Sequence, residues 1–339
     1  MISFNSDYLE GCTAEILDAL NKTNLEQTEG YGLDKHSERA RELIKRKIGR
    51  SDVDIHFVSG GTQANLLTLS VLLSPYQSVI SADSGHIAIH ETGSIETTGH
   101  QVIRVKNDDG KLNAEDVLEI VRAAEEDYTA RPGAVYISES TESGTIYSLD
   151  ELKALRKVTK DNGIALFIDG ARLAYALEST KADFTLRDIA DLSDAFYIGG
   201  TKCGALFGEA IVICSDKYKK DFRKAMKARG AMLAKGRILG IQFETLFTDD
   251  LYFRLAREAN RKADEIKNAF KAHGIRLYAD SYTNQQFVVL SDAQAEKIKE
   301  NFSFEVWGKE GDETIARFCT SWATGEDAVN ALKDAIKTL

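Results

Sequence analysis

The sequence predicts an α/β protein in which a large, mostly parallel sheet is covered by helices on both faces and is followed by a small α+β unit. Short apolar runs alternate with helical segments over residues 55–214, which is the pattern of right-handed βαβ crossovers. Residues 216–270 are helical almost throughout, and the rest of the chain is mixed. A chain of 339 residues is long enough for two such units.

The large unit is expected to begin with two helices, over residues 12–22 and 36–48, the second with an apolar face that includes Ala40 and Ile44. Five strands are then expected, at residues 55–58, 78–81, 102–105, 135–138 and 164–169. A helix is expected after each of them, from Thr62 and at residues 86–91, 113–126, 150–161 and 171–177 respectively. Two more strands are expected at 195–198 and 210–214.

The carboxyl-terminal part of the chain changes character after residue 216. The helical stretch breaks near Asp249 and Asp250. The final segment has strands at 275–278, 286–290, 304–307 and 314–319 and a helix at 325–338. We therefore expect one domain over residues 1–250, including the N-terminal helical segment, and a small α+β domain over residues 251–339.

Composition excludes several classes of protein. Lys and Arg number 43 against 53 Asp and Glu, and the net charge of −10 argues against a nucleic-acid binder. The longest apolar stretches, such as residues 66–73, fall far short of the ~20 residues that a membrane helix needs. No signal peptide is visible, and the four cysteines form no Cys-x-x-Cys pair. We expect a cytoplasmic protein that binds neither nucleic acid nor membrane.

Two charged residues follow neighbouring predicted strands. Asp169 ends the strand 164–169, and Lys202 comes shortly after the strand 195–198. In open α/β sheets, ligands bind beyond the carboxyl ends of the strands, so this acid and this lysine are expected to be close neighbours at such a site. A structural salt bridge or two solvated loop residues would explain the pair equally well.

A glycine-containing loop favours the functional interpretation. Residues 59–65 read Ser-Gly-Gly-Thr-Gln-Ala-Asn between a strand and a helix, where backbone N–H groups suit a phosphate. The loop is neither a Walker motif nor Gly-x-Gly-x-x-Gly, and by itself it is a weak signal. With His86 as a partner for an aromatic ring, and with Asp169 and Lys202, the set suits pyridoxal phosphate. In that chemistry a lysine forms a Schiff base and an Asp keeps the pyridine nitrogen protonated.

The chain also resembles the threonine aldolases of the fold-type-I pyridoxal-phosphate enzymes, over almost all of its length. The resemblance is greatest to the low-specificity and phenylserine-aldolase-like branch. The segments that carry the resemblance are Asn5–Asp7, Tyr31–Asp34, Gly61–Asn65, Glu139–Asp150, Asp169–Arg172, Thr201–Lys202 and Ile315–Thr324. It implies a fold-type-I transferase-like fold, with pyridoxal 5′-phosphate as the cofactor. It also implies a homodimer or homotetramer with shared active sites.

The resemblance also implies roles for individual residues. Lys202 would form the Schiff base, Asp169 would pair with the pyridine nitrogen, and His86 would lie against the ring. The other cofactor-binding positions would be Gly61 and Thr62 at the phosphate, with Arg172, Thr201 and, more loosely, Lys235. Ser6, Arg172 and Arg317 would surround the substrate carboxylate. Tyr31 and Lys235 would reach the neighbouring subunit's site.

One position departs from the family pattern. Many threonine aldolases have a second active-site histidine in an Asn-Thr-His-Asn-Gly type of loop, where this chain has Ser-Thr-Glu-Ser-Gly around Glu142. Glu142 either acts as a base on the substrate hydroxyl or is merely exposed, so the base is His86 directly or a group that acts through water, for which Glu142 is a candidate. His86 and His90 have the spacing of metal ligands, but a third ligand is not apparent, so we expect no metal.

The expected reaction is cleavage of a β-hydroxy-α-amino acid, of the threonine, allo-threonine or phenylserine type, to glycine and an aldehyde. Two alternatives stay open at this point. The same cofactor also serves a β-eliminating lyase, a racemase or an aminotransferase. A binding or regulatory protein could keep the fold without turnover, although Lys202, Asp169 and the phosphate loop are all intact.

Overall fold

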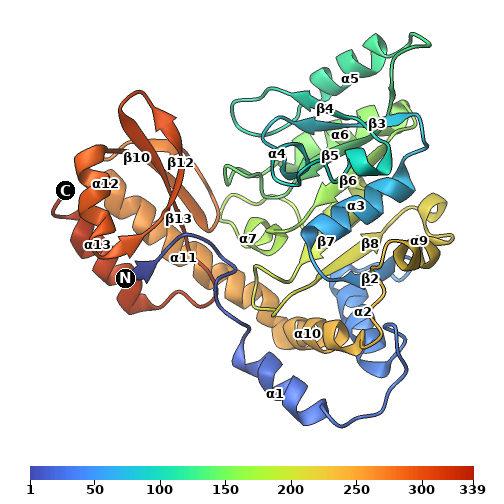
Figure 1. Cartoon of the computed structure of the whole chain (residues 1–339), viewed down its shortest axis with the longest axis horizontal. Helices are drawn as coiled ribbons and strands as arrows, with labels where there is room; N and C mark the ends of the chain where they lie inside the picture. The colour runs from blue at the N-terminus through green and yellow to red at the C-terminus, as the bar shows by residue number, and fades with distance from the viewer.

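A seven-stranded sheet forms the centre of the large unit in a computed structural model that describes residues 1–339 (Figure 1). Its strand order is β2-β8-β7-β6-β5-β3-β4. The strands are β2 (Asp54–Val58), β3 (Gln77–Ala82), β4 (Val102–Val105), β5 (Arg131–Ser138), β6 (Ala165–Asp169), β7 (Ala195–Gly199) and β8 (Glu209–Ile213). Only β8 runs antiparallel to its neighbours, β2 and β7. The predicted α/β class and mostly parallel sheet are confirmed.

Helices cover both faces of this sheet. They are α1 (Ala14–Thr23), α2 (Lys35–Ile48), α3 (Gly61–Leu72), α4 (His86–Ile89), α5 (Ala114–Ala123), α6 (Leu149–Asp161), α7 (Leu173–Leu177), α8 (Leu186–Leu192), α9 (Phe222–Ala228) and α10 (Arg237–Phe247), with short 3-10 turns η1 (Glu96–Thr98), η2 (Asp216–Tyr218) and η3 (Thr248–Asp250). Side chains alternate along each strand, so Val135 and Ile137 of β5 enter one apolar core, whereas Ala134 and Tyr136 enter the other. This double burial explains why the strands read as continuous apolar runs.

The small unit contains a four-stranded antiparallel sheet in the order β12-β13-β10-β9. Its elements are β9 (Leu277–Ala279), β10 (Gln285–Ser291), α12 (Asp292–Lys299), β11 (Phe302–Ser303), β12 (Glu305–Glu310), β13 (Glu313–Cys319) and α13 (Glu326–Ile336). The start of the chain, β1 (Ile2–Ser3), pairs with β11, and Phe4 is buried in the core of this unit.

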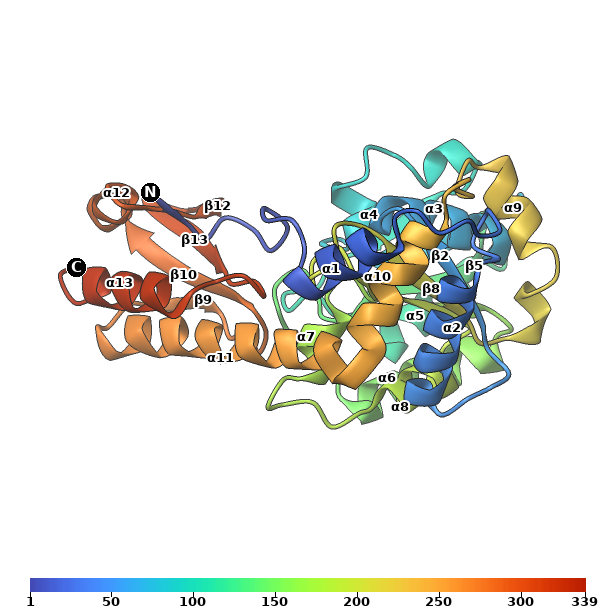
Figure 2. The same cartoon turned by 90° about the horizontal axis from the view of Figure 1, so that it is seen from below.

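The long helix α11 (Leu251–Ala272) connects the two units, as Figure 2 shows from below. Leu251 and Ala259 lie in a core of the large unit, whereas Ile266 and Phe270 lie in that of the small unit. No helix in the chain is both long enough and apolar enough to cross a membrane. The domain division at residues 250 and 251 stays a prediction.

The structure differs from the sequence expectations at several short elements. The expected helical stretch after residue 216 is interrupted at Gly230, whose φ of +68° ends α9, and residues 231–236 form a loop and turn. The break at Asp249 and Asp250 is confirmed, because both residues have positive φ. Helices α8 and α12 were not anticipated. Both are short, and each begins with a capping box, at Thr185 and Ser291 respectively.

Candidate active site

The candidate site lies at the carboxyl ends of the central strands, where the large unit faces the small one (Figure 1). Asp169 is the last residue of β6, and Lys202 follows the end of β7 at Gly199. The first turn of α3 and the short helix α4 follow β2 and β3 at the same edge. The parallel order of β3, β5, β6 and β7 therefore places these segments of the chain side by side.

Asp169 is a buried carboxylate that accepts hydrogen bonds from four donors. The hydroxyls of Tyr136 and Tyr197 each lie 2.5 Å from one of its oxygens, and Asn65 Nδ2 and the Ala171 N–H each lie 3.0 Å away. Burial by itself raises the pKa of Asp169, but the charge of His86 and the hydrogen bonds of the two tyrosines outweigh it. The pKa is therefore lowered, and the carboxylate is ionised.

The loop that carries Lys202 is fixed by its backbone. The Glu209 carboxyl accepts from the Gly200 N–H at 2.9 Å and from Thr201 Oγ1 at 2.8 Å, and the Tyr175 hydroxyl donates to the Lys202 carbonyl at 2.5 Å. Thr201 is thus placed by Glu209, beside the lysine. Burial raises the pKa of Glu209 to about 8.

The first turn of α3 forms an open cradle for an anion. Its cap residue, Gly60, has no side chain to satisfy the first N–H groups of the helix, and a Cβ added there would meet no atom within 4 Å. A Cβ on Gly61 would instead come within 3.1 Å of the Tyr197 hydroxyl. Tyr197 also donates to Asp169, so the absence of a side chain at Gly61 lets the first turn of α3 pack directly against the tyrosine that binds this carboxylate.

His86 begins α4, and its side chain is 28% exposed. Its Nδ1 atom lies 2.8 Å from Oε1 of Glu91, whose side chain is fully buried. Burial lowers the pKa of His86, but the hydrogen bond to Glu91 and the charges of Glu142 and Asp169 raise it above its usual range. His90 lies next to His86, with ring centroids 5.5 Å apart.

Arg172 forms a buried, two-pronged ion pair with Asp7. Its Nε and Nη2 atoms lie 2.8 and 3.0 Å from the two oxygens of Asp7, and Asn284 Nδ2 donates to the same carboxylate at 2.9 Å. Burial raises the pKa of Asp7, but the charges of Arg172 and Lys202 outweigh it and lower this pKa. Burial lowers the pKa of Arg172, but the Asp7 charge outweighs it and raises this pKa.

Glu142 and Ser6 complete this side of the cleft. Oε2 of Glu142 lies 3.8 Å from Nη1 of Arg172, on the part of the guanidinium that Asp7 leaves free. The Ser6 hydroxyl is buried and makes no hydrogen bond within the chain. Glu142 therefore lies beside the Arg172 guanidinium, and Ser6 directly precedes its counter-ion Asp7 in the chain.

Arg317 reaches the cleft from strand β13 of the small unit. Its Nη1 and Nη2 atoms each lie 3.0 Å from an acceptor, Oε1 of Gln285 and the Asn5 carbonyl respectively, and Nη2 also pairs with Glu305. Its Nε is buried without a partner. The Trp307 ring covers the guanidinium at 5.3 Å and also lies against His90 of the large unit, with centroids 6.4 Å apart. Arg317 therefore sits where the two units meet.

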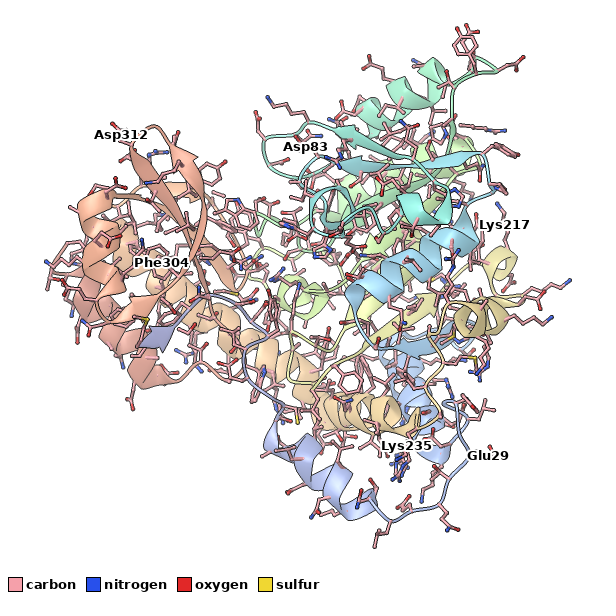
Figure 3. The ribbon with its side chains drawn as sticks, in the orientation of Figure 1. Glu29, Asp83, Lys217, Lys235, Phe304 and Asp312 are labelled. Carbon is pink, nitrogen blue, oxygen red and sulfur yellow. The ribbon has the colours of Figure 1, made fainter.

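Tyr31 and Lys235 lie together on the outside of the large unit. The Tyr31 N–H donates to the Ala234 carbonyl at 3.2 Å, and the Tyr31 side chain is exposed. Figure 3 labels Lys235 and Glu29 at the lower edge of the large unit, near the start of α10. The Tyr31 backbone therefore contacts the residue before Lys235, whereas the ammonium over the Tyr31 ring is that of Lys227, 4.8 Å from its centroid.

Several residues of this site had no role in the sequence interpretation. They are Asp7, Asn65, Glu91, Tyr136, Tyr197, Gln285, Glu305 and Trp307. Asp7 and Asn65 stand inside motifs that carried the resemblance, so the sequence contained a signal for both. The tyrosines occupy ordinary strand positions, and no local pattern distinguishes them from core residues. No group of three or more His, Cys, Asp or Glu side chains is arranged to hold a metal ion.

These residues fit pyridoxal phosphate on chemical grounds. The cradle at Gly60 and Gly61 has room and free N–H donors for a phosphate. The buried, ionised Asp169 suits a protonated ring nitrogen, and Lys202 supplies a primary amine for the aldehyde carbon. His86 offers a flat ring at the same end of the sheet.

Comparisons with known proteins agree with this geometry. The fold is that of the fold-type-I enzymes. A Thermus thermophilus aspartate aminotransferase, 15% identical, superposes with a TM-score of 0.74 over 100% of this chain and 92% of its own, which shows the shared fold alone. Residues 3–293 match the beta-eliminating lyase family, and the chain belongs to that family.

Two relatives are more similar. A low-specificity L-threonine aldolase of Pseudomonas sp. is 31% identical over 343 residues, which covers 99% of this chain and 97% of the relative. The structure of Leishmania major threonine aldolase is 42% identical and has a TM-score of 0.98. The superposition covers 100% of this chain and 99% of that chain. Both relatives match from end to end, so the similarity includes the small unit as well as the sheet.

The raised pKa of Glu209 makes stability depend on pH. A carboxyl with a pKa of about 8 in the fold and 4.5 when unfolded favours the folded state while it is protonated. Its contribution therefore falls as pH rises from about 5 to 8, by up to ~1.4 kcal/mol per pH unit. We expect the free energy of unfolding of wild type, measured with urea, to fall relative to that of Glu209→Gln as pH rises over this range, because glutamine does not titrate. The exposed control Glu300→Gln should show no such trend, and a Glu209→Gln difference independent of pH would contradict the raised pKa.

Proposed function

We propose that the protein is a pyridoxal-phosphate-dependent aldolase. It cleaves the Cα–Cβ bond of L-β-hydroxy-α-amino acids, of the threonine, allo-threonine or phenylserine type, into glycine and an aldehyde. The main support is that Lys202, the ionised Asp169 and the Gly61 cradle share one end of the sheet, in a chain 42% identical throughout to Leishmania major threonine aldolase. The absence of a basic surplus and of a membrane-crossing helix fits a small-molecule substrate.

The cofactor is held by residues of the large unit. Pyridoxal phosphate, when bound, accepts the electron pair that remains on Cα when the bond to Cβ breaks. Lys202 would anchor the cofactor through its primary amine. Asp169 would keep the ring nitrogen protonated, and the N–H groups at Gly61 and Thr62 would hold the phosphate.

The substrate carboxylate is held where the two units meet. Arg172 and Arg317 supply charge-assisted donors from the large and the small unit, and Ser6 supplies a free hydroxyl. Three donors from fixed parts of the chain would hold the carboxylate and thereby fix the orientation of the substrate. A base then removes the β-hydroxyl proton, and His86 and Glu142 are the two groups in position for this step.

Shared active sites in a dimer or tetramer complete the proposal. Exposed apolar side chains gather near the start of the chain and in the segment that carries Tyr31, namely Tyr8, Leu9, Leu17, Leu25, Tyr31 and Leu33. A second copy covering them would bring Tyr31 and Lys235 to a neighbour's cofactor. All four cysteines are free and buried, which fits the reducing cytoplasm.

The cofactor assignment is tested by Lys202→Ala. Wild type loaded with pyridoxal phosphate should show the visible absorbance of a lysine-linked cofactor, and the variant should lose it because no amine remains at that position. Absorbance spectra before and after dialysis measure the effect. Lys220→Ala, on the exposed surface, is the control. A variant with an unchanged band would overturn the assignment of Lys202.

The reaction is tested by product analysis with L-threonine, L-allo-threonine and the phenylserine isomers. We expect equal amounts of glycine and aldehyde from at least one of them, quantified by chromatography of the derivatised products. The ranking reports what the Glu142 loop selects. Pyruvate or ammonia instead of glycine would indicate an eliminating lyase. Bound cofactor with no product from any substrate would reject the aldolase.

Sharing of sites is tested by complementation between two impaired variants. Lys202→Ala and Lys235→Ala subunits should each form weak enzymes, because each lacks one part of every site. If they are co-expressed and pair at random, half of the dimers are hybrids with one intact site of two. We expect about a quarter of the wild-type activity to return. Activity no higher than the mean of the two parents would show that each chain builds its own site.

A further inference from the structure

Glu91 is a buried carboxylate that faces the ring of His86. Its side chain is fully buried, and no lysine or arginine pairs with it. Oε1 accepts from Asn65 Nδ2 at 2.7 Å and lies 2.8 Å from His86 Nδ1, whereas Oε2 accepts from Ser94 Oγ at 2.6 Å. The Glu91 carboxylate thus has three hydrogen-bond partners, Asn65, His86 and Ser94, and only the histidine among them can carry a positive charge.

This arrangement determines which nitrogen of His86 carries a proton. Both oxygens of Glu91 already accept, from Asn65 and Ser94, so Nδ1 of His86 is the donor in its contact with Oε1. The other nitrogen, Nε2, makes no hydrogen bond within the chain and belongs to a side chain that is 28% exposed. In its neutral form, His86 therefore presents a free electron pair on Nε2.

Asn65 extends this contact to the site of the cofactor. Its Nδ2 donates to Glu91 at 2.7 Å and to Asp169 at 3.0 Å, so one amide bridges two buried carboxylates. Asn65 lies in α3, one turn after the Gly61 cradle. A continuous series of hydrogen bonds therefore runs from Asp169, through Asn65 and Glu91, to His86.

We propose that Glu91 is the positioning residue that holds His86 with Nδ1 protonated and Nε2 open to the cleft, which makes His86 the base for the substrate's β-hydroxyl. This inference rests on the proposed function. The O–H bond breaks and its proton moves to Nε2. The oxygen's electron pair forms the aldehyde carbonyl, and the Cα–Cβ pair remains on Cα. Glu91 stabilises the imidazolium that results.

The other charged groups around His86 favour His86 over Glu142 as the base. The carboxylates of Glu142 and Asp169, the ammonium of Lys202 and the ring of His90 face His86. Glu142 itself lies 3.8 Å from the Arg172 guanidinium, where it serves as a second counter-ion. Glu91 has no such cation and can stabilise only the proton on His86.

The test of the positioning role is a histidine titration that does not depend on turnover. Full-length protein labelled with ¹³C at histidine Cε1 is titrated by NMR, before and after pyridoxal phosphate is added, and His86→Asn assigns the signal. We expect Glu91→Gln to lower the pKa of His86 by at least about one unit, because the charge that favours the imidazolium is lost. An unchanged His86 titration in Glu91→Gln would overturn the proposal.

Two further variants control this measurement. Glu139→Gln replaces another fully buried carboxyl, whose own pKa is raised by burial, and should leave His86 unchanged. Ser94→Ala keeps the charge of Glu91 but removes a donor from Oε2, so the pKa of His86 should rise slightly. If Glu91→Gln does not fold, Ser94→Ala still decides the matter, because a fall or no change would contradict the proposal.

The acid limb of the kcat profile provides the second readout. In wild type it should follow the pKa of His86. In Glu91→Gln it should move to lower pH, and the plateau should fall roughly tenfold to a hundredfold because the base is weaker. A limb that moves in Glu142→Gln and stays in Glu91→Gln would assign the base to Glu142. Wild type that makes no glycine would reject the proposed function, while the NMR result would still report on Glu91.

Discussion

The buried, ionised carboxylate of Asp169 constrains the rest of the site. Removing such a charge from water costs several kcal/mol unless donors surround it. Here the donors come from β5, β7, α3 and the backbone after β6. These elements must therefore stay in close register. The packing is so tight that a Cβ on Gly170 would lie 1.8 Å from the Tyr197 carbonyl oxygen. The hydrogen bonds to Asp169 thus hold strands β5 and β7 and the start of α3 in place relative to one another, and the lysine loop follows directly from β7.

A second buried charge joins the two units. Asp7 follows the strand that pairs with β11, accepts from Arg172 of the large unit and accepts from Asn284 just before β10. The ion pair therefore contacts three separate parts of the chain. Because Asp7 occupies the Nε and Nη2 atoms of Arg172, only Nη1 is left for a further partner, and Glu142 lies next to it. The ion pair that joins the two units therefore also limits which atom of the Arg172 guanidinium a further group can reach.

His86 shows how burial and charge together set a protonation state. Burial by itself disfavours the imidazolium, and the carboxylates of Glu91, Glu142 and Asp169 oppose that effect. The result depends on groups from α3 and from the loops after β3, β5 and β6. The sequence singles out His86 as a candidate, but its protonation is set by these neighbours.

The sequence by itself determined the fold class and the main chemical groups. Alternating apolar runs predicted the parallel sheet, because every strand is buried on both faces, and strand ends located Asp169 and Lys202 correctly at one edge. Tertiary structure alone decided which distant side chains surround them. Tyr136, Tyr197 and Glu91 look like core or surface residues until the strands are assembled, and no periodicity reports a contact such as Asp7 with Arg172, 165 residues apart. Hydrophobic periodicity in the sequence indicates which side chains are buried. Which donors or cations neutralise a buried charge depends on which distant segments of the chain come into contact.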